Sequence, residues 1–147
     1  MILSRPAPSA EDNPRQPTVL VVEDEMLIRS AVAEYLRKLG YRVVEAADAA
    51  EAVAVFSSGE PIDVVLCDVD LPGTMDGLSL GRWINRRRSA PPVLLTSGRS
   101  IGLSAGERTA FSFIAKPYRL PALAERLKQV LASRDPAAGD GSEPEPR

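Results

Sequence analysis

Two hydrophobic periodicities alternate along the chain. Short apolar runs without a polar break, at residues 18–22 and 62–67, predict strands that are buried on both faces. Elsewhere apolar residues recur at helical spacing, as in residues 28–39, where Gly40 predicts the end of the helix. The complete pattern predicts strands at residues 18–22, 41–44, 62–67, 93–96 and 111–115, and helices at residues 28–39, 48–56, 78–87, 100–110 and 121–131.

Strand and helix alternate five times along the chain, which predicts an α/β fold. Such alternation calls for a doubly wound, five-stranded parallel sheet with helices on both faces, joined by right-handed crossovers. In this fold class, ligands bind beyond the carboxyl ends of the strands, where the strand order reverses. The residues that follow the predicted strands are therefore the first candidates for function.

Charged and hydroxyl side chains stand at the carboxyl ends of four predicted strands. In a parallel sheet these ends meet at one edge. Single residues of these kinds usually belong to turns, but their joint placement predicts one shared anionic site. The residues of this predicted site are Glu23 and Asp24 after the first strand, Asp68 and Asp70 after the third, Thr96 at the end of the fourth, and Lys116 after the fifth.

The carboxylates of such a site repel one another, by about 4 kcal/mol for two groups ~4 Å apart at an effective dielectric constant near 20. A divalent cation, a lysine or protonation of one acid must offset this repulsion. The chain contains no histidine, which excludes histidine-based triads and histidine-ligated metals, and oxygen ligands alone favour Mg²⁺. A carboxylate beside Mg²⁺ could attack phosphorus, while Lys116 and Thr96 would bind phosphoryl oxygens.

Five stretches of the chain form a recognisable set of motifs. They are VLVVEDE (19–25), DVVLCDVDLPG (63–73), MDGL (75–78), VLLTSG (93–98) and FIAKPY (113–118). Together they resemble the receiver domain of bacterial two-component response regulators, over residues 18–133. The resemblance implies a flavodoxin-like (βα)5 fold. Since no output domain is recognised after residue 133, we expect a stand-alone, single-domain response regulator.

The resemblance also implies a role for each residue of the predicted site. Asp68 would accept a phosphoryl group from the phosphohistidine of a sensor histidine kinase or a histidine phosphotransfer protein. Mg²⁺ would be held by Glu23, Asp24, Asp68 and the backbone carbonyl of Asp70. Lys116 would pair with the phosphoryl oxygens.

Two further residues match the switch positions of the family. Thr96 would be the switch hydroxyl and Phe113 the switch aromatic, and the bond between Lys116 and Pro117 would be cis. Phosphorylation would move Thr96 and repack Phe113, which changes a surface read by an unknown downstream protein. The domain would then be a signalling switch and not an enzyme, with only self-phosphorylation and autodephosphorylation chemistry of its own.

Two alternatives stay open from the sequence. A haloacid-dehalogenase-type phosphatase also places an aspartate nucleophile after a buried strand and a second aspartate two residues later, as Asp68 and Asp70 are placed. However, the continuation Leu-Pro-Gly does not match that family, and the chain is short for its cap insertion. The other alternative is a degenerate receiver that folds without being phosphorylated, against which the full residue set argues.

Composition sets the remaining expectations. The chain has 147 residues, one cysteine and a net charge of −2. Residues 1–17 and 134–147 are rich in proline and small residues and are expected to be flexible tails, the second one acidic, around one domain at residues 18–133. That domain has equal numbers of basic and acidic residues, so no nucleic-acid partner is expected. Short apolar runs predict no membrane span, and a lone cysteine suits the reducing cytoplasm.

Overall fold

The computed structural model describes residues 16–134, so the predicted tails lie outside the described residues except at their inner ends. Five parallel strands form one sheet in the order β2-β1-β3-β4-β5. The strands are β1 (Thr18–Val22), β2 (Arg42–Ala46), β3 (Val64–Asp68), β4 (Val93–Ser97) and β5 (Ser112–Ala115). The helices are α1 (Met26–Lys38), α2 (Ala49–Ser57), α3 (Gly77–Asn85), α4 (Ala105–Ala110) and α5 (Leu120–Arg134).

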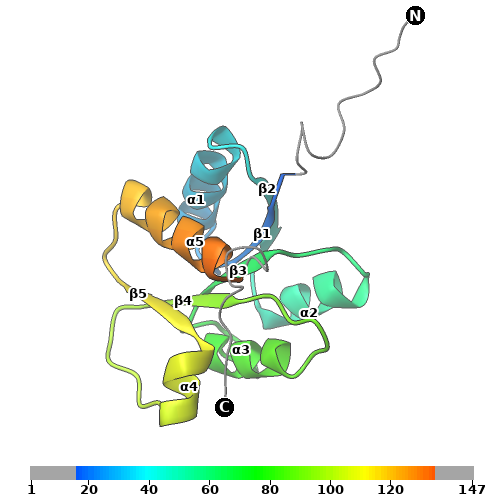
Figure 1. Cartoon of the computed structure of the whole chain (residues 1–147), viewed down its shortest axis with the longest axis vertical. Helices are drawn as coiled ribbons and strands as arrows, with labels where there is room; N and C mark the ends of the chain where they lie inside the picture. Colours follow the sequence, from blue (N-terminus) through cyan, green and yellow to red (C-terminus); the bar gives the residue numbers. More distant parts are fainter. Residues whose placement is uncertain (1–15, 135–147) are drawn as a thin grey trace, which may run out of the picture.

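Helices cover both faces of the sheet (Figure 1). α1 and α5 lie on one face, and α2, α3 and α4 lie on the other. This doubly wound, flavodoxin-like arrangement confirms the predicted fold class. The strand order reverses at β1 and β3, so the carboxyl ends of these two strands border the crevice where such folds bind ligands. None of the helices within residues 16–134 has the length and hydropathy needed to cross a membrane.

Strand β1 shows why the sheet has two cores. All five of its residues are buried. Leu20 and Val22 pack in the cluster with α2 and α3, whereas Val19 and Val21 pack in the cluster with α1 and α5. Successive side chains of a strand point to opposite faces, so a strand covered on both faces needs an uninterrupted apolar run.

Polar residues and one glycine fix where the helices begin and end. Oδ1 of Asp48 accepts a hydrogen bond from the N–H of Glu51 at 2.8 Å, which caps α2 as predicted. Asp76 caps α3 in the same way through the N–H of Ser79, at 2.8 Å. Gly40 follows α1 with a φ of +101°, a left-handed conformation that favours glycine and ends the helix.

The clearest difference from the predicted elements is at α4. The helix covers only Ala105–Ala110 of the predicted 100–110. Ser104 and Glu107 form a capping box there, so the chain becomes helical only after Ser104. Other bounds differ by one to three residues, as element ends commonly do, and α5 continues through Arg134, which was assigned to the tail.

Candidate functional site

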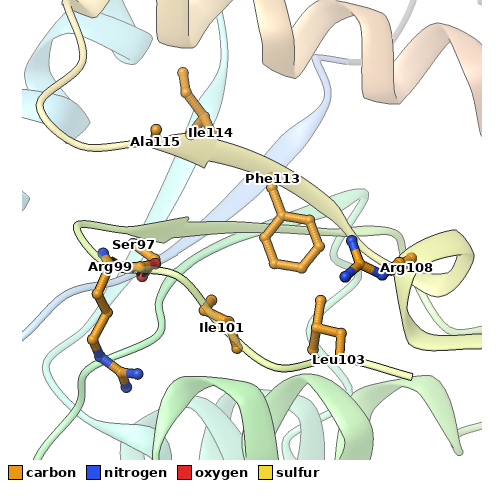
Figure 2. Close-up of a pocket in the computed structure, with 8 residues that line it drawn as sticks. All are labelled: Ser97, Arg99, Ile101, Leu103, Arg108, Phe113, Ile114 and Ala115. Atoms are coloured by element: carbon orange, nitrogen blue, oxygen red, sulfur yellow. Dashed lines mark hydrogen bonds between the residues drawn. The ribbon is translucent and has the colours of Figure 1, made fainter. Parts of the chain in front are cut away.

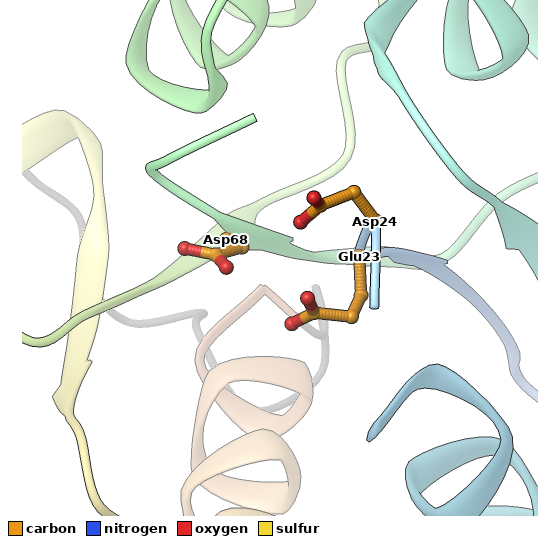
Figure 3. Close-up of side chains that lie close together, drawn as sticks. All are labelled: Glu23, Asp24 and Asp68. Carbon is orange, nitrogen blue, oxygen red and sulfur yellow. The ribbon is translucent and has the colours of Figure 1, made fainter. Parts of the chain in front are cut away.

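Three carboxylates gather at the carboxyl ends of β1 and β3 (Figure 3). Glu23 and Asp24 directly follow β1, and Asp68 is the last residue of β3. Each side chain offers one oxygen atom, and these atoms lie within 4.8 Å of one another. Glu23 and Asp68 are each 5% exposed, whereas Asp24 is exposed. The group therefore opens to solvent on the side of Asp24.

Backbone N–H groups orient two of the three carboxylates. The N–H of Glu25 donates to Oε2 of Glu23 at 3.0 Å, and the N–H of Asp70 donates to Oδ1 of Asp68 at 3.0 Å. Nη1 of Arg29 donates to the carbonyl oxygen of Glu23 at 2.7 Å and holds the turn after β1. The two N–H donors fix the orientation of the Glu23 and Asp68 carboxylates and leave further oxygen lone pairs available to a cation.

Lys116 supplies a positive charge within the site. Its Nζ donates to Oδ2 of Asp68 at 2.7 Å, and its N–H donates to the carbonyl oxygen of Ser97 at 2.8 Å. The peptide bond between Lys116 and Pro117 is cis. Burial lowers the pKa of Lys116, but the hydrogen bond and the charge of Asp68 outweigh burial, so the pKa is raised above its usual value. The ammonium group stays charged and offsets one carboxylate.

The negative charge that Lys116 leaves uncompensated fits a divalent cation. Burial is the main reason why the pKa of Glu23 is raised; the N–H of Glu25 lowers it, and the nearby charge of Asp68 raises it further. The three grouped side chains present only carboxylate oxygens, which is the ligand type that Mg²⁺ prefers. Glu23, Asp24 and Asp68 would therefore hold Mg²⁺, with water completing the coordination.

The raised pKa of Glu23 predicts a pH dependence of metal binding. The carboxyl group keeps its proton to a higher pH than an exposed glutamate does, because its pKa is raised, and Mg²⁺ must displace that proton. We expect Mg²⁺ affinity to fall as the pH decreases through this raised pKa. The Glu23→Gln variant should bind Mg²⁺ more weakly at neutral pH. In the metal-free protein, the substitution should raise the free energy of unfolding by about 1 kcal/mol, since a buried charge is removed.

Calorimetric titration with Mg²⁺ at several pH values, together with denaturant unfolding, checks this expectation. Glu34→Gln is the control, because Glu34 is exposed on α1 and forms a surface ion pair with Lys38. An unchanged pH dependence of Mg²⁺ binding in Glu23→Gln would contradict the assignment of that dependence to Glu23.

Thr96 lies next to Asp68 across two neighbouring strands. The two residues are partners in the register of β3 and β4. Thr96 is 2% exposed, and together with Glu23 and Asp68 it lines a small hollow on the face covered by α1 and α5. The structure thus brings Glu23, Asp24, Asp68, Thr96 and Lys116 to one edge of the sheet.

Phe113 lies apart from the carboxylate group. It is a half-buried residue of β5 and lines a pocket of about 340 Å³ between β5 and the segment before α4 (Figure 2). Ile101, Leu103 and Arg108 line the same pocket. The phenyl ring borders open space and has room to change its packing.

Asp70 directs its carboxylate to a partner that the sequence analysis did not single out. Its Oδ1 accepts hydrogen bonds from Nε and Nη2 of Arg99, at 3.1 and 2.8 Å. The side chain of Asp70 is therefore not part of the carboxylate group. One sequence signal pointed to Arg99: it directly follows the Thr-Ser-Gly end of the fourth predicted strand, at the edge where the acids meet.

Comparison with known proteins identifies the family. The model of the response regulator receiver domain matches residues 19–128. The chain belongs to the response regulator receiver family. The resemblance seen in the motifs is thereby confirmed, and the family match adds to the case against a phosphatase of the haloacid-dehalogenase type. Receiver domains are signalling domains of two-component systems.

Similar receivers occur in proteins of different architecture. The transcriptional regulatory protein PdtaR of Mycobacterium tuberculosis is 40% identical over 117 residues, which cover 78% of this chain and 56% of PdtaR. The receiver domain of the hybrid histidine kinase CckA is 37% identical, with a TM-score of 0.65 and coverage of 78% of this chain and 98% of that chain. The response regulator TrrA of Thermotoga maritima, solved in complex with Mg²⁺-BeF, is 28% identical, with a TM-score of 0.68 and coverage of 78% and 99%. This receiver chain spans about half the length of the first curated relatives it matches.

Proposed function

We propose that this receiver accepts a phosphoryl group on Asp68, in a Mg²⁺-dependent reaction, from the phosphohistidine of a sensor histidine kinase or a histidine phosphotransfer protein. The observation that carries the proposal is the buried Asp68 carboxylate, which has Lys116 Nζ at 2.7 Å and the Glu23 and Asp24 carboxylates beside it. The similarity to a receiver solved with Mg²⁺-BeF supports the metal requirement. The buried free thiol of Cys67 agrees with a reducing compartment such as the cytoplasm.

The reaction would be an in-line displacement at phosphorus. A carboxylate oxygen of Asp68 forms the new P–O bond while the P–N bond to the donor imidazole breaks, and the imidazole nitrogen keeps the bonding electron pair and takes up a proton. Catalysis of such a step depends on positioning and charge neutralisation. Lys116 would pair with the oxygens of the transferred phosphoryl group. Bound Mg²⁺ would neutralise more of the phosphoryl charge.

The phosphoryl group would then act as the signal. It adds a charge of about −1.5 to −2 at neutral pH beside Thr96 and Lys116. The Thr96 hydroxyl would donate a hydrogen bond to it, and the segment after β4 would follow Thr96. Because Ile101 and Leu103 in this segment line the pocket of Phe113, the movement would repack the Phe113 ring and alter the surface offered to a downstream protein.

Intact-mass spectrometry after incubation with acetyl phosphate and Mg²⁺ tests the proposal. We expect the wild type to gain the mass of one phosphoryl group, and to gain nothing when EDTA removes the metal. Asp68→Asn keeps the size of the side chain and should gain nothing. No gain by the wild type, as a degenerate receiver would show, or an equal gain by Asp68→Asn, would overturn the proposal.

A further inference from the structure

A salt bridge joins the two loops on either side of the Asp68 site. Arg99, two residues after β4, donates from Nε and Nη2 to Oδ1 of Asp70, two residues after β3. The side chains are 58% and 55% exposed. Ion pairs at such exposure contribute little to folding stability. Their charges act mainly on what approaches from solvent.

Both partners are held close to the reacting carboxylate. The N–H of Asp70 donates to Oδ1 of Asp68, which fixes Asp70 beside the phosphoacceptor. Ser97, the neighbour of Thr96, accepts from the N–H of Arg99 at 3.1 Å and donates to its carbonyl oxygen at 2.9 Å. Arg99 is one of the residues that line the Phe113 pocket, and its side chain extends away from the Phe113 ring (Figure 2).

The salt bridge changes the balance of charge around Asp68. Within residues 16–134, the ammonium group of Lys116 is the one that pairs with the group of Glu23, Asp24 and Asp68, through Asp68. Asp70, whose N–H donates to Asp68, adds a fourth carboxylate close by in the chain, and Arg99 is the cation paired with it. A phosphoryl donor is an anion, so an uncompensated carboxylate at this position would repel it.

We propose that Arg99 neutralises Asp70 so that highly charged phosphoryl donors can approach Asp68, which makes Arg99 a determinant of donor preference. The inference rests on the proposed function of Asp68. The other role that the salt bridge could have is that of a clamp, which would hold the two loops in position. The two roles predict different results for the same variants.

Charge compensation has opposite effects on anions and cations. In Arg99→Gln, the exposed Asp70 carboxylate should slow phosphorylation by acetyl phosphate, a dianion, by about three- to tenfold at low ionic strength. Phosphoramidate, a monoanion at neutral pH, should lose only about two- to threefold. Mg²⁺ should bind about two- to fivefold more tightly to the same variant. High salt should reduce all three differences.

Compensating variants complete the test. Asp70→Asn/Arg99→Gln lacks the salt bridge but keeps the net charge of the wild type, so we expect it to react with acetyl phosphate at a rate within about twofold of the wild-type rate. Arg99→Lys keeps the charge and should do the same. Arg86→Gln removes one charge from the exposed end of α3 and should leave rates and Mg²⁺ affinity unchanged.

The measurements are phosphorylation rates with both donors at low and high salt, and calorimetric Mg²⁺ titrations, on variants whose melting temperatures match the wild type. Equal rates in Arg99→Gln and the wild type would overturn the inference. Weaker Mg²⁺ binding in Arg99→Gln would also overturn it, and so would a double variant that reacts as slowly as Arg99→Gln. Both results are expected if the salt bridge acts as a clamp. If the wild type takes no phosphoryl group from either donor, the proposed function itself fails.

Discussion

Lys116→Gln is expected to lower the rate at which acetyl phosphate phosphorylates Asp68 by about 10²- to 10³-fold. In the wild type, Lys116 Nζ lies 2.7 Å from Oδ2 of Asp68, where the phosphoryl oxygens would arrive. Glutamine can donate a hydrogen bond but carries no charge. The variant would therefore lose the ammonium charge that lies beside the developing negative charge.

Time courses of intact-mass spectrometry with acetyl phosphate measure this loss. Lys128→Gln removes the same charge from an exposed position on α5 and should phosphorylate at the wild-type rate. The loss in Lys116→Gln should persist at saturating Mg²⁺, since bound Mg²⁺ would not replace the charge of the ammonium group. A rate within about threefold of the wild-type rate would show that Lys116 does not stabilise the transferring group.

Gly77→Ala is expected to lower the free energy of unfolding by about 3 kcal/mol or more and to disable the site. A Cβ atom at residue 77 would meet the carbonyl oxygen of Asp68 and the Cα atom of Val69 at 2.7 Å or less. Both are backbone atoms of the segment that carries Asp68, so neither can move as a side chain could. The N–H of Gly77 also donates to the carbonyl oxygen of Val69 at 2.7 Å, which holds α3 against this segment.

Denaturant unfolding and phosphorylation by acetyl phosphate measure the two effects of Gly77→Ala. Gly106→Ala is the matched control, because a Cβ atom there meets only the Ser104 hydroxyl oxygen, at 4.0 Å. We expect that control to keep its stability, since alanine also favours α4. Wild-type stability in Gly77→Ala would mean that α3 can move away from Asp68 at little cost.

The apolar pattern predicts most of the fold and the edge where the site lies. The uninterrupted apolar run of β1 can be buried only between two layers of helices. The cap of α2 is also local, because Asp48 directly precedes the helix that it caps. Because parallel strands end at one edge, Asp68 and Lys116 can be expected to meet although they are 48 residues apart. The direction of the strands alone brings these two side chains together, whatever the conformation of the loops.

Loop-dependent contacts could not be predicted in this way. The salt bridge between Asp70 and Arg99 joins two irregular segments, and no hydrophobic period specifies their path. The close approach of Gly77 to the backbone of Asp68 depends on how the segment between β3 and α3 folds back, which the glycine alone does not reveal. The start of α4 at Ser104 likewise depends on a local capping box that competes with a weak helical pattern.

Reductive trapping of the phosphorylated residue tests the central claim most directly. Borohydride reduces an aspartyl phosphate to homoserine, and peptide sequencing by mass spectrometry then locates the change. After incubation with acetyl phosphate and Mg²⁺, we predict homoserine at residue 68 and aspartate at residues 24 and 70. Homoserine at either of those other positions, or at none, would contradict the assignment of Asp68 as the phosphoacceptor.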